Sequence, residues 1–149
     1  MIDRFAGSHE FLSNFYPSPI MDTGILYPTA EHLYQALKTL DAGQRRHIAS
    51  FKSPGRAKRA GRRLVLRSDW DEIKVDLMVG ILEKKFSDVA LRKQLLDTYP
   101  KELVEGNDWG DVYWGVCKGR GENMLGKILM ALRETYLAEV SSVTETPPG

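Results

Sequence analysis

The sequence predicts a mostly helical α+β fold, in a single domain with a small β-sheet. Apolar residues recur at three- and four-residue steps in several segments, whereas residues 1–27 and 102–116 are interrupted by proline, glycine and aromatic residues. A chain of 149 residues is also long enough to bury a core of its own. Because no repeat or interdomain linker interrupts it, we expect one domain over residues 1–138 and a flexible tail over 139–149.

The first 40 residues are predicted to form short strands followed by a helix. Residues 1–27 contain prolines and glycines between short apolar pieces, which is typical of loops with one or two strands. Thr29 is then a suitable N-cap for a helix that runs to about Leu40. The apolar face of this helix has four residues at helical spacing: Leu33, Ala36, Leu37 and Leu40.

Two further helices are predicted from capping residues. Ser53 caps the first of them, because Pro54 suits the first helical position. Ser68 and Asp71 form a capping-box pattern at the start of the second. The apolar positions of that second helix are Trp70, Ile73, Leu77 and Ile81.

The C-terminal part is predicted as helix, then strand and loop, then helix. The first helix covers about residues 89–98, and the last covers about residues 123–138. Between them, residues 102–116 are rich in tryptophan, tyrosine and glycine, which favours strands and loops. The buried face of the last helix is expected to contain Leu125, Ile128, Leu129 and Leu132.

Composition excludes several classes of protein. The single cysteine, Cys117, rules out an intrachain disulfide and a cysteine-only metal site, and three scattered histidines have no metal-ligand spacing. No apolar run approaches the roughly 18 to 20 residues that cross a bilayer, and the N-terminus lacks the apolar region of a signal peptide. We therefore expect a soluble, cytoplasmic protein that contacts no membrane and holds no metal.

Positive charge is concentrated in residues 45–67, which we call the basic block. This segment has nine basic residues and no acidic residue, although the net charge of the whole chain is only +1. Such a block raises the local concentration of anions, so a phosphate is its natural partner. A solvated surface balanced by acidic residues elsewhere is the alternative interpretation.

One face of the predicted helix over residues 29–40 carries four different polar groups. At 100° per residue, they fall within an arc of about 100° opposite the leucines. They are Glu31, Tyr34, Gln35 and Lys38. An ordinary solvated face would have the same pattern. A ligand-facing stripe is favoured by the tyrosine, which is costly to leave in water, and by Glu31, which lies beside the backbone N–H groups of the first turn.

A second group of candidate residues lies further along the chain. Asp108 and Asp111 are close in sequence to Trp109, Tyr113 and Trp114. Aromatic rings beside a carboxylate suit a stacked base next to a polar reaction centre. An aromatic mini-core with surface acids would use the same residues, so both interpretations stay open.

The glycine-rich run over residues 121–127 resembles part of a phosphate-binding P-loop. Ile128, however, stands where a serine or threonine must bind magnesium, and the apolar period of the last helix runs through Gly126 and Lys127. We therefore reject the P-loop. A glycine-rich turn that holds a phosphate with the N–H groups of a helix N-terminus stays open.

Several of these segments occur together in an order and spacing that resemble a known family. They are residues 11–15 (FLSNF), residues 27–38 (YPTAEHLYQALK), Ser53-Pro54 with Ala57 and Gly61, Trp70, Lys85-Phe86, residues 111–115 (DVYWG), residues 121–127 (GENMLGK), and Leu129, Met130 and Arg133. This set, over residues 10–137, resembles the NADAR family (named for NAD and ADP-ribose chemistry), also called YbiA-like. The agreement of several independent pieces makes the resemblance specific.

The resemblance implies a largely helical α+β domain that cleaves N-glycosidic bonds. Members of the family look like N-glycosidases that act on phosphorylated riboflavin-pathway intermediates, or like hydrolases that remove ADP-ribose from guanine bases. We therefore expect a phosphorylated, nucleotide-like substrate, with ADP-ribosylated DNA or RNA as one form of it. No cofactor and no obligate protein partner are expected.

The resemblance also implies site residues. Its catalytic positions correspond to Glu31, Lys38 and Asp111. Its substrate-binding positions correspond to Ser13, Asn14, Phe15, Tyr34, Gln35, Trp70, Trp114, Gly115 and Asn123. The Asp-x-x-Trp-Gly spacing favours Asp111 over Asp108 as the second acid.

The chemistry of the reaction fits these residue types. Breaking a C1′–N bond builds positive charge on the sugar and negative charge on the leaving nitrogen, so carboxylates and a proton donor are needed. Lys38 has two open roles, as an electrostatic partner of the substrate or as a nucleophile that captures C1′ as an imine. Two other functions stay open as well. A non-catalytic ADP-ribose reader would not need Glu31 and Asp111 together, and a nucleic-acid-binding module would depend on the basic block.

Overall fold

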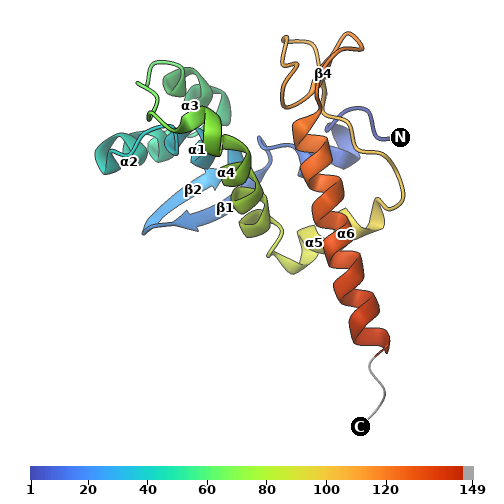
Figure 1. Cartoon of the computed structure of the whole chain (residues 1–149). Helices are drawn as coiled ribbons and strands as arrows, with labels where there is room; N and C mark the ends of the chain where they lie inside the picture. Colours follow the sequence, from blue (N-terminus) through green and yellow to red (C-terminus); the bar gives the residue numbers. More distant parts are fainter. Residues whose placement is uncertain (146–149) are drawn as a thin grey trace. The chain divides into compact units, whose positions relative to one another are not determined.

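The computed structural model describes residues 1–145, which form two compact units. We call residues 14–88 the hairpin unit, and residues 1–13 together with the chain from Val89 onward the terminal unit. Both units consist of helices with a two-stranded sheet (Figure 1). The predicted mostly helical α+β class is therefore confirmed.

The hairpin unit begins with an antiparallel β-hairpin. β1 (Pro17–Asp22) pairs with β2 (Ile25–Thr29). The two residues that join them, Thr23 and Gly24, have φ angles of 45° and 81°. A two-residue turn with positive φ at both positions has a twist that matches the twist of the strands. The strands expected in this part of the chain are therefore confirmed.

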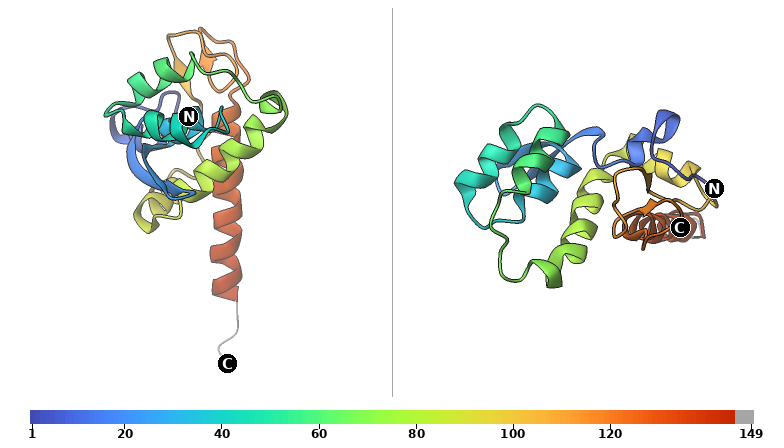
Figure 2. Two further views of the ribbon diagram at one scale, coloured as in Figure 1. Left: turned by 90° about the vertical axis from the view of Figure 1, so that its left-hand side faces the viewer. Right: turned by 90° about the horizontal axis from the view of Figure 1, so that it is seen from above.

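Helix α1 (Ala30–Ala36) is at the centre of the hairpin unit. It contacts both strands and the helices α2 (Ala42–Ser50), α3 (Pro54–Gly61) and α4 (Trp70–Lys85), which lie around it in Figures 1 and 2. Thr29 caps α1 as predicted, because its hydroxyl accepts a hydrogen bond from a backbone N–H of the first turn. All seven residues of α1 are buried, so its polar stripe is not a solvated face.

The end of α1 differs from the prediction. The helix ends at Ala36, and Leu40 is 70% exposed instead of lying on the apolar face. The chain turns here because the Thr39 hydroxyl accepts the Asp41 N–H, and the Asp41 carboxylate in turn caps α2. The pattern of apolar residues does not predict α2, because Ile48 is its one buried residue.

Helices α3 and α4 form where they are predicted, with a difference at the start of α4. Ser53 caps α3 as expected. The capping box over Ser68–Asp71 is wrong, because the N-cap is Asp69 and no side chain caps the helix. The Asp69 carboxylate instead accepts from the Arg67 guanidinium at 2.7 Å. The Arg67 backbone N–H donates at 2.9 Å to the Lys38 carbonyl, just after α1, and this bond holds Arg67 in place.

The terminal unit is mainly helical. Its described helices are η1 (Gly7–Leu12), α5 (Val89–Asp97) and α6 (Met124–Glu145). β3 (Gly106–Asn107) pairs in parallel with β4 (Val116–Cys117), so the predicted strand-and-loop segment has strands of only two residues. The predicted apolar face of α6 is confirmed, since its members are buried: Leu125, Ile128, Leu129 and Leu132.

Helix α6 is longer than predicted. It continues to Glu145 and includes part of the segment 139–149 that we expected to be a flexible tail, so the predicted domain boundary falls inside a helix. After its first turn α6 contains no glycine or proline that would end it. Glu139, beyond the predicted end, lies 3.6 Å from Arg92 of α5. Residues 146–149 lie outside the described part of the chain.

Two absences can be stated for the part of the chain that the structure describes. None of its helices combines the length and the apolar character required to span a bilayer. Within the same residues, no group of three or more histidine, cysteine or acidic side chains is arranged to hold a metal ion. Cys117 is buried in β4 as a free thiol.

Lys85 is a buried lysine at the end of α4. Lys85 is only 2% exposed. Its Nζ lies 5.8 Å from the centre of the Tyr16 ring and 5.3 Å from the centre of the Phe86 ring. Burial lowers the pKa of the Lys85 ammonium from 10.5 to about 7. Between these two values the unfolded chain holds a proton that the folded chain has lost, so stability must increase with pH in this range.

We expect Lys85 to make the free energy of unfolding rise by up to about 1.4 kcal/mol per pH unit between pH 7 and pH 9. The Lys85→Met variant should lose this part of the slope, because methionine carries no proton in either state. Urea unfolding of both proteins across this pH range measures the difference. Lys84→Met, which removes an exposed lysine of the same helix, should keep the slope. Parallel slopes for the wild type and Lys85→Met would contradict the prediction.

Candidate active site

The predicted site residues of the hairpin unit lie together around α1. Four come from α1 and the turn that follows it, two from the turn before β1, and one from the start of α4. In chain order they are Asn14, Phe15, Glu31, Tyr34, Gln35, Lys38 and Trp70. Hydrogen bonds and ring contacts connect most of them, and we call this group the α1 cluster.

Glu31 is a buried carboxylate that is held by a residue of its own helix. Glu31 is 7% exposed, and Gln35 Nε2 donates to its Oε1 at 2.7 Å. Gln35, one turn later, is 3% exposed. Its own Oε1 is buried and has no hydrogen-bond partner among the described residues. The first turn of α1 thus presents an oriented carboxylate in a nearly dry environment.

Two aromatic rings lie beside this carboxylate and amide pair. The ring centres of Tyr34 and Trp70 are 5.3 Å apart, with an angle of 50° between their planes. Both residues are at least nine-tenths buried. Lys38 places its Nζ 5.6 Å from the centre of the Tyr34 ring, within the range of a cation–π contact. The cluster therefore combines an apolar wall with one carboxylate and one amine.

Lys38 has an altered acidity because of its surroundings. Burial lowers the pKa of its ammonium, and the charges of Arg62 and Lys58 lower the pKa further. The Glu31 carboxylate acts in the opposite direction and raises the pKa of Lys38. Lys38 therefore lies in the electrostatic field of Glu31. Two residues that act together in one site must be close enough to influence each other in this way. Its amine is also more readily neutral than that of an exposed lysine.

Lys58 and Arg62 belong to the basic block but are not among the predicted site residues. Both belong to α3 and its C-cap, four residues apart, so they lie on one side of that helix. Together with Lys38 they form three cationic groups that influence one another. The four-residue spacing of Lys58 and Arg62 indicates that they share one side of a helix. The sequence does not indicate that this side of α3 is near Lys38.

Asn14 and Phe15 join the cluster through the turn before β1. The Asn14 carbonyl accepts the Glu31 backbone N–H at 3.0 Å, which connects this turn to the start of α1. The Asn14 Nδ2 lies 3.5 Å from the Met78 sulfur, and its Oδ1 is buried with no partner within residues 1–145. Phe15 is 42% exposed, and the Lys58 Nζ lies 6.0 Å from the centre of its ring. An exposed ring and a buried amide oxygen are both suited to contact a ligand.

His32, beside Glu31 in the sequence, has a structural role. Its Nε2 lies 2.8 Å from the Phe51 carbonyl, and its Nδ1 lies 2.7 Å from the Thr29 hydroxyl. Because a carbonyl can only accept, we assign the proton to Nε2, and Nδ1 then accepts from Thr29. Burial lowers the pKa of His32, which favours this neutral form.

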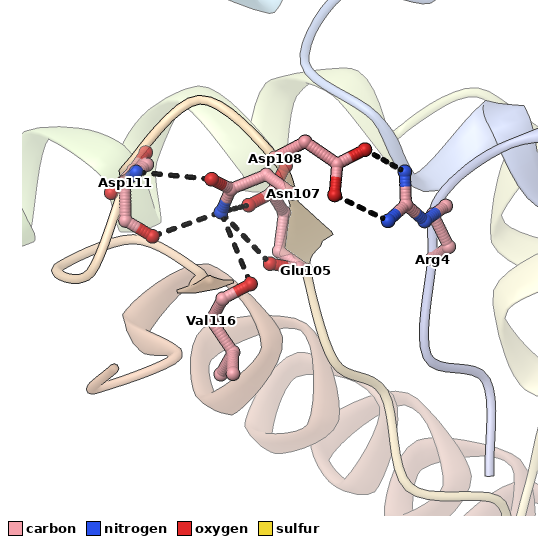
Figure 3. A network of polar contacts seen from close by, with 6 residues as sticks. All are labelled: Arg4, Glu105, Asn107, Asp108, Asp111 and Val116. Atoms are coloured by element: carbon pink, nitrogen blue, oxygen red, sulfur yellow. Dashed lines mark hydrogen bonds and ion pairs between the residues drawn. The ribbon is translucent and has the colours of Figure 1, made fainter. Parts of the chain in front are cut away.

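The other predicted residues belong to the terminal unit, where a loop is built around Asn107 (Figure 3). Asn107 is 3% exposed, and its Nδ2 donates to the Asp111 carbonyl at 2.9 Å and to the Glu105 carboxylate at 3.2 Å. Its Oδ1 accepts the Asp111 N–H at 3.0 Å. In sequence Asn107 has the appearance of an ordinary turn residue, so sequence reasoning missed its central position in this network.

Asp111 holds the turn that carries Trp114. One oxygen of its carboxylate, Oδ1, accepts the backbone N–H groups of Tyr113 at 3.1 Å and of Trp114 at 2.9 Å. The two rings that follow meet edge to face, with their centres 4.9 Å apart. This use of the carboxylate is structural. The catalytic role of Asp111 and the stacking role of Trp114 stay predictions.

Asp108, the alternative second acid, is part of a surface ion pair. Two hydrogen bonds, of 3.0 and 3.1 Å, join its carboxylate to the Arg4 guanidinium (Figure 3). This pairing lowers the pKa of Asp108. Its side chain is 77% exposed. Asp108 therefore interacts with a cation at the surface, whereas Asp111 interacts with the backbone of its own loop.

Three predicted substrate-binding residues of the terminal unit make contacts that stabilise the local backbone. Ser13 ends η1, and its N–H donates to a carbonyl of that helix. Gly115 is buried where an added Cβ would lie 1.9 Å from the Glu105 carboxylate. The Asn123 side chain accepts the Glu105 N–H and donates to the Leu103 carbonyl, both at 2.9 Å. Their contacts with a substrate stay predictions.

Gly126 and Lys127 lie within the first turn of α6, as the rejection of a P-loop requires. A Cβ on Gly126 would lie 2.2 Å from the Leu103 carbonyl oxygen. Close packing of α6 against this carbonyl is thus a sufficient reason for a glycine at this position.

An open hollow of about 490 Å³ lies elsewhere on the hairpin unit. Residues of α2 and of the chain around α3 line it, among them His47, Phe51 and Arg63. None of the lining residues is a predicted site residue. Part of the basic block therefore faces this hollow, while Lys58 and Arg62 act on Lys38.

Comparison with known proteins identifies similar chains. The family model described as the NADAR domain matches residues 4–136. The N-glycosidase YbiA of Escherichia coli (strain K12) is 43% identical over 145 residues, which cover 93% of this chain and 90% of that protein. A riboflavin biosynthesis protein of Vibrio vulnificus is 38% identical over 131 residues, which cover 85% of this chain and 35% of that protein.

The fold has a counterpart among solved structures. The solution NMR structure of YbiA from E. coli superposes with a TM-score of 0.82 at 37% sequence identity, covering 99% of this chain and 92% of that one. A chloroplastic riboflavin biosynthesis protein of Zea mays, named PYRR, is also similar, at 37% identity over 152 residues that cover 89% of this chain and 24% of that protein. The similarity thus extends over nearly the whole chain.

Proposed function

Because this chain belongs to the NADAR family, we propose that it is an N-glycosidase, a hydrolase of N-glycosyl bonds whose substrate is a phosphorylated ribosyl compound. Two substrate classes fit: ADP-ribosylated guanine, free or in nucleic acid, and phosphoribosyl intermediates of riboflavin biosynthesis. The observation that carries the proposal is the buried Glu31 carboxylate, oriented by Gln35 and within the field of the Lys38 amine. The N-glycosidase and riboflavin biosynthesis names of the relatives support the same choice.

The α1 cluster supplies what cleavage of a C1′–N bond requires. As the bond breaks, positive charge develops on the ribose, and the Glu31 carboxylate stabilises that charge from a nearly dry position. Tyr34 and Trp70 form an apolar wall beside it. Because few water molecules compete there, the attraction between carboxylate and sugar is stronger than it would be at an exposed surface.

The remaining site residues are assigned proposed roles in binding. Asn14 has a buried amide oxygen that can accept a ribose hydroxyl, and the exposed Phe15 ring can stack on a base. Gln35 is proposed to serve the substrate site by holding the Glu31 carboxylate. Asp111 is proposed as the second carboxylate and Trp114 as a stacking ring, on the strength of the family resemblance. Ser13, Gly115 and Asn123 are proposed to contact substrate on the same basis.

Lys58 and Arg62 are proposed to bind the phosphate of the substrate. Both influence the charge of Lys38, so a phosphate held by them lies close to the proposed reaction centre. Replacement of both by glutamine is expected to raise KM by about 10-fold or more and to change kcat less, because phosphate binding is largely common to ground and transition states. Steady-state kinetics at low and moderate salt measure this effect, which should shrink as salt increases.

Two other arginines of the basic block provide a matched control for this prediction. Arg59→Gln combined with Arg63→Gln removes the same charge from exposed neighbours, and Arg63 borders the separate hollow. This pair should change KM by a smaller factor. Equal effects of the two pairs would show that the basic block attracts the substrate only through its total charge, and not through Lys58 and Arg62.

One experiment tests the function itself. The protein is mixed with a DNA oligonucleotide that carries ADP-ribosylated guanine and, separately, with an aminated ribose-phosphate pyrimidine. Chromatography with mass detection then follows the released base and sugar. We expect hydrolysis of at least one of them. Binding of ADP-ribose without release of any product would overturn the proposal in favour of a non-catalytic reader.

A further inference from the structure

Gly61, the last residue of α3, packs directly against the side chain of Gln35. A Cβ built on Gly61 would lie 1.9 Å from Gln35 Oε1, 2.7 Å from its Cδ and 3.0 Å from its Cβ. The φ angle of Gly61 is one that any residue adopts, so the backbone does not require a glycine here. The missing side chain is required because the space is already filled by Gln35.

Gln35 cannot move away from Gly61 without weakening its hydrogen bond to Glu31. Its amide is fixed on one side by the 2.7 Å hydrogen bond from Nε2 to the Glu31 carboxylate, and on the other side its Oε1 faces Gly61. The residue is 3% exposed, so there is little open space into which the amide could rotate. Any shift that relieved a clash at Gly61 would therefore lengthen or break the bond to Glu31.

We propose that Gly61 is a positioning residue: the absence of a Cβ there allows Gln35 to hold the Glu31 carboxylate in place for the reaction. This inference rests on the proposed function in one respect, because it takes Glu31 to be the carboxylate that acts on the substrate. Gly61 itself touches no substrate. It acts through Gln35, from a different helix.

Alanine substitutions within α3 test the proposal. Gly61→Ala introduces the clash, whereas Gly55→Ala, in the first turn of the same helix, places its Cβ where no atom lies within 4 Å. Both changes improve the helix propensity by a similar amount. We expect Gly61→Ala to lower kcat by about 10- to 100-fold, the scale of a misplaced reacting group, with a smaller change in KM. Gly55→Ala should leave kcat unchanged.

A double-mutant cycle separates positioning from a general effect on folding. Gln35→Ala removes the amide group, which makes the two closest contacts with the new methyl group, and with it the hydrogen bond to Glu31. If Gly61 acts through Gln35, the combination of Gly61→Ala with Gln35→Ala should be no less active than Gln35→Ala alone, although the two single losses are each large. The double variant lacks both contacts shorter than 3.0 Å, so it should fold even if Gly61→Ala does not. Losses that multiply in the double variant would overturn the proposal.

A readout without substrate keeps this inference distinct from the proposed function. The side-chain amide protons of Gln35, observed by NMR, report its hydrogen bond to Glu31. We expect their signals to shift and exchange faster in Gly61→Ala but not in Gly55→Ala. Unchanged signals in Gly61→Ala would refute the positioning role whatever the activity. Failure of the wild type to hydrolyse any N-glycoside, with the expected NMR change, would refute only the proposed function.

Discussion

Glu31→Gln is expected to lower kcat by about 100-fold or more, the scale of one positioned acid or base. Glutamine keeps the size of the side chain and can still accept the hydrogen bond from Gln35 Nε2, but it carries no charge. It therefore cannot stabilise the cationic sugar or take a proton from water. Steady-state kinetics measure the loss, with whichever of the two proposed substrates the wild type hydrolyses.

The same substitution should leave the fold intact. Glu31 is 7% exposed, so replacing its charge with a neutral amide removes the cost of keeping a charge in a dry place, and the melting temperature should stay nearly constant or rise. Glu72→Gln is a matched control, because Glu72 also lies in the first turn of a helix of the hairpin unit but is exposed. It should retain full activity. An active Glu31→Gln enzyme would show that Glu31 is not the catalytic carboxylate.

Periodicity contributed to the prediction of α1, α4, α5 and α6, whereas α3 was predicted from its cap and η1 was not predicted. It failed for α2, which buries only Ile48 and is held in place by its cap and its contacts with α1. It also extended α1 too far. A leucine at position 40 continues the apolar pattern, but the Thr39 and Asp41 side chains turn the chain before it. Local hydrogen bonds of this kind determine where a helix ends, and they cannot be predicted from the pattern of apolar residues.

The site was predicted in part for a similar reason. The spacing of Glu31 and Gln35 already placed them one turn apart on one face, and the structure adds that this face is buried and that the two side chains bond. The positions of Lys58, Arg62 and Gly61 relative to that face depend on how α3 packs against α1. Contacts between helices are set by tertiary packing, so no spacing within the sequence indicates that Gly61 touches Gln35.

If Lys38 acts as the nucleophile, which is one of its two proposed roles, borohydride added during turnover should capture a sugar on it. In this reaction the Lys38 amine attacks C1′ as the bond to the base breaks, and the base leaves with the bonding electrons and takes up a proton. The ribosyl-lysine then opens to an imine, and water releases the sugar and restores the amine. Borohydride reduces the imine to a stable amine, which appears as an added mass on the peptide that contains Lys38.

The surroundings of Lys38 favour the neutral amine that this attack needs. Burial lowers its pKa, and Arg62 and Lys58 lower it further, while Glu31 opposes them. Because only the neutral form attacks, kcat should fall as the pH decreases through the lowered pKa of Lys38. A purely electrostatic partner of a phosphate would give the opposite dependence, since it acts as the charged form.

Lys38→Arg separates these two roles. Arginine keeps the positive charge but stays protonated and cannot attack, so this variant should lose both borohydride labelling and hydrolysis, with kcat reduced by about 1,000-fold or more if the covalent step is essential. Lys52→Arg makes the same change at an exposed lysine of the basic block and should keep both. If Lys38→Arg remains active, or if the wild type is not labelled, then water attacks C1′ directly. Lys38 would in that case contribute only its charge, beside the Glu31 carboxylate that raises its pKa.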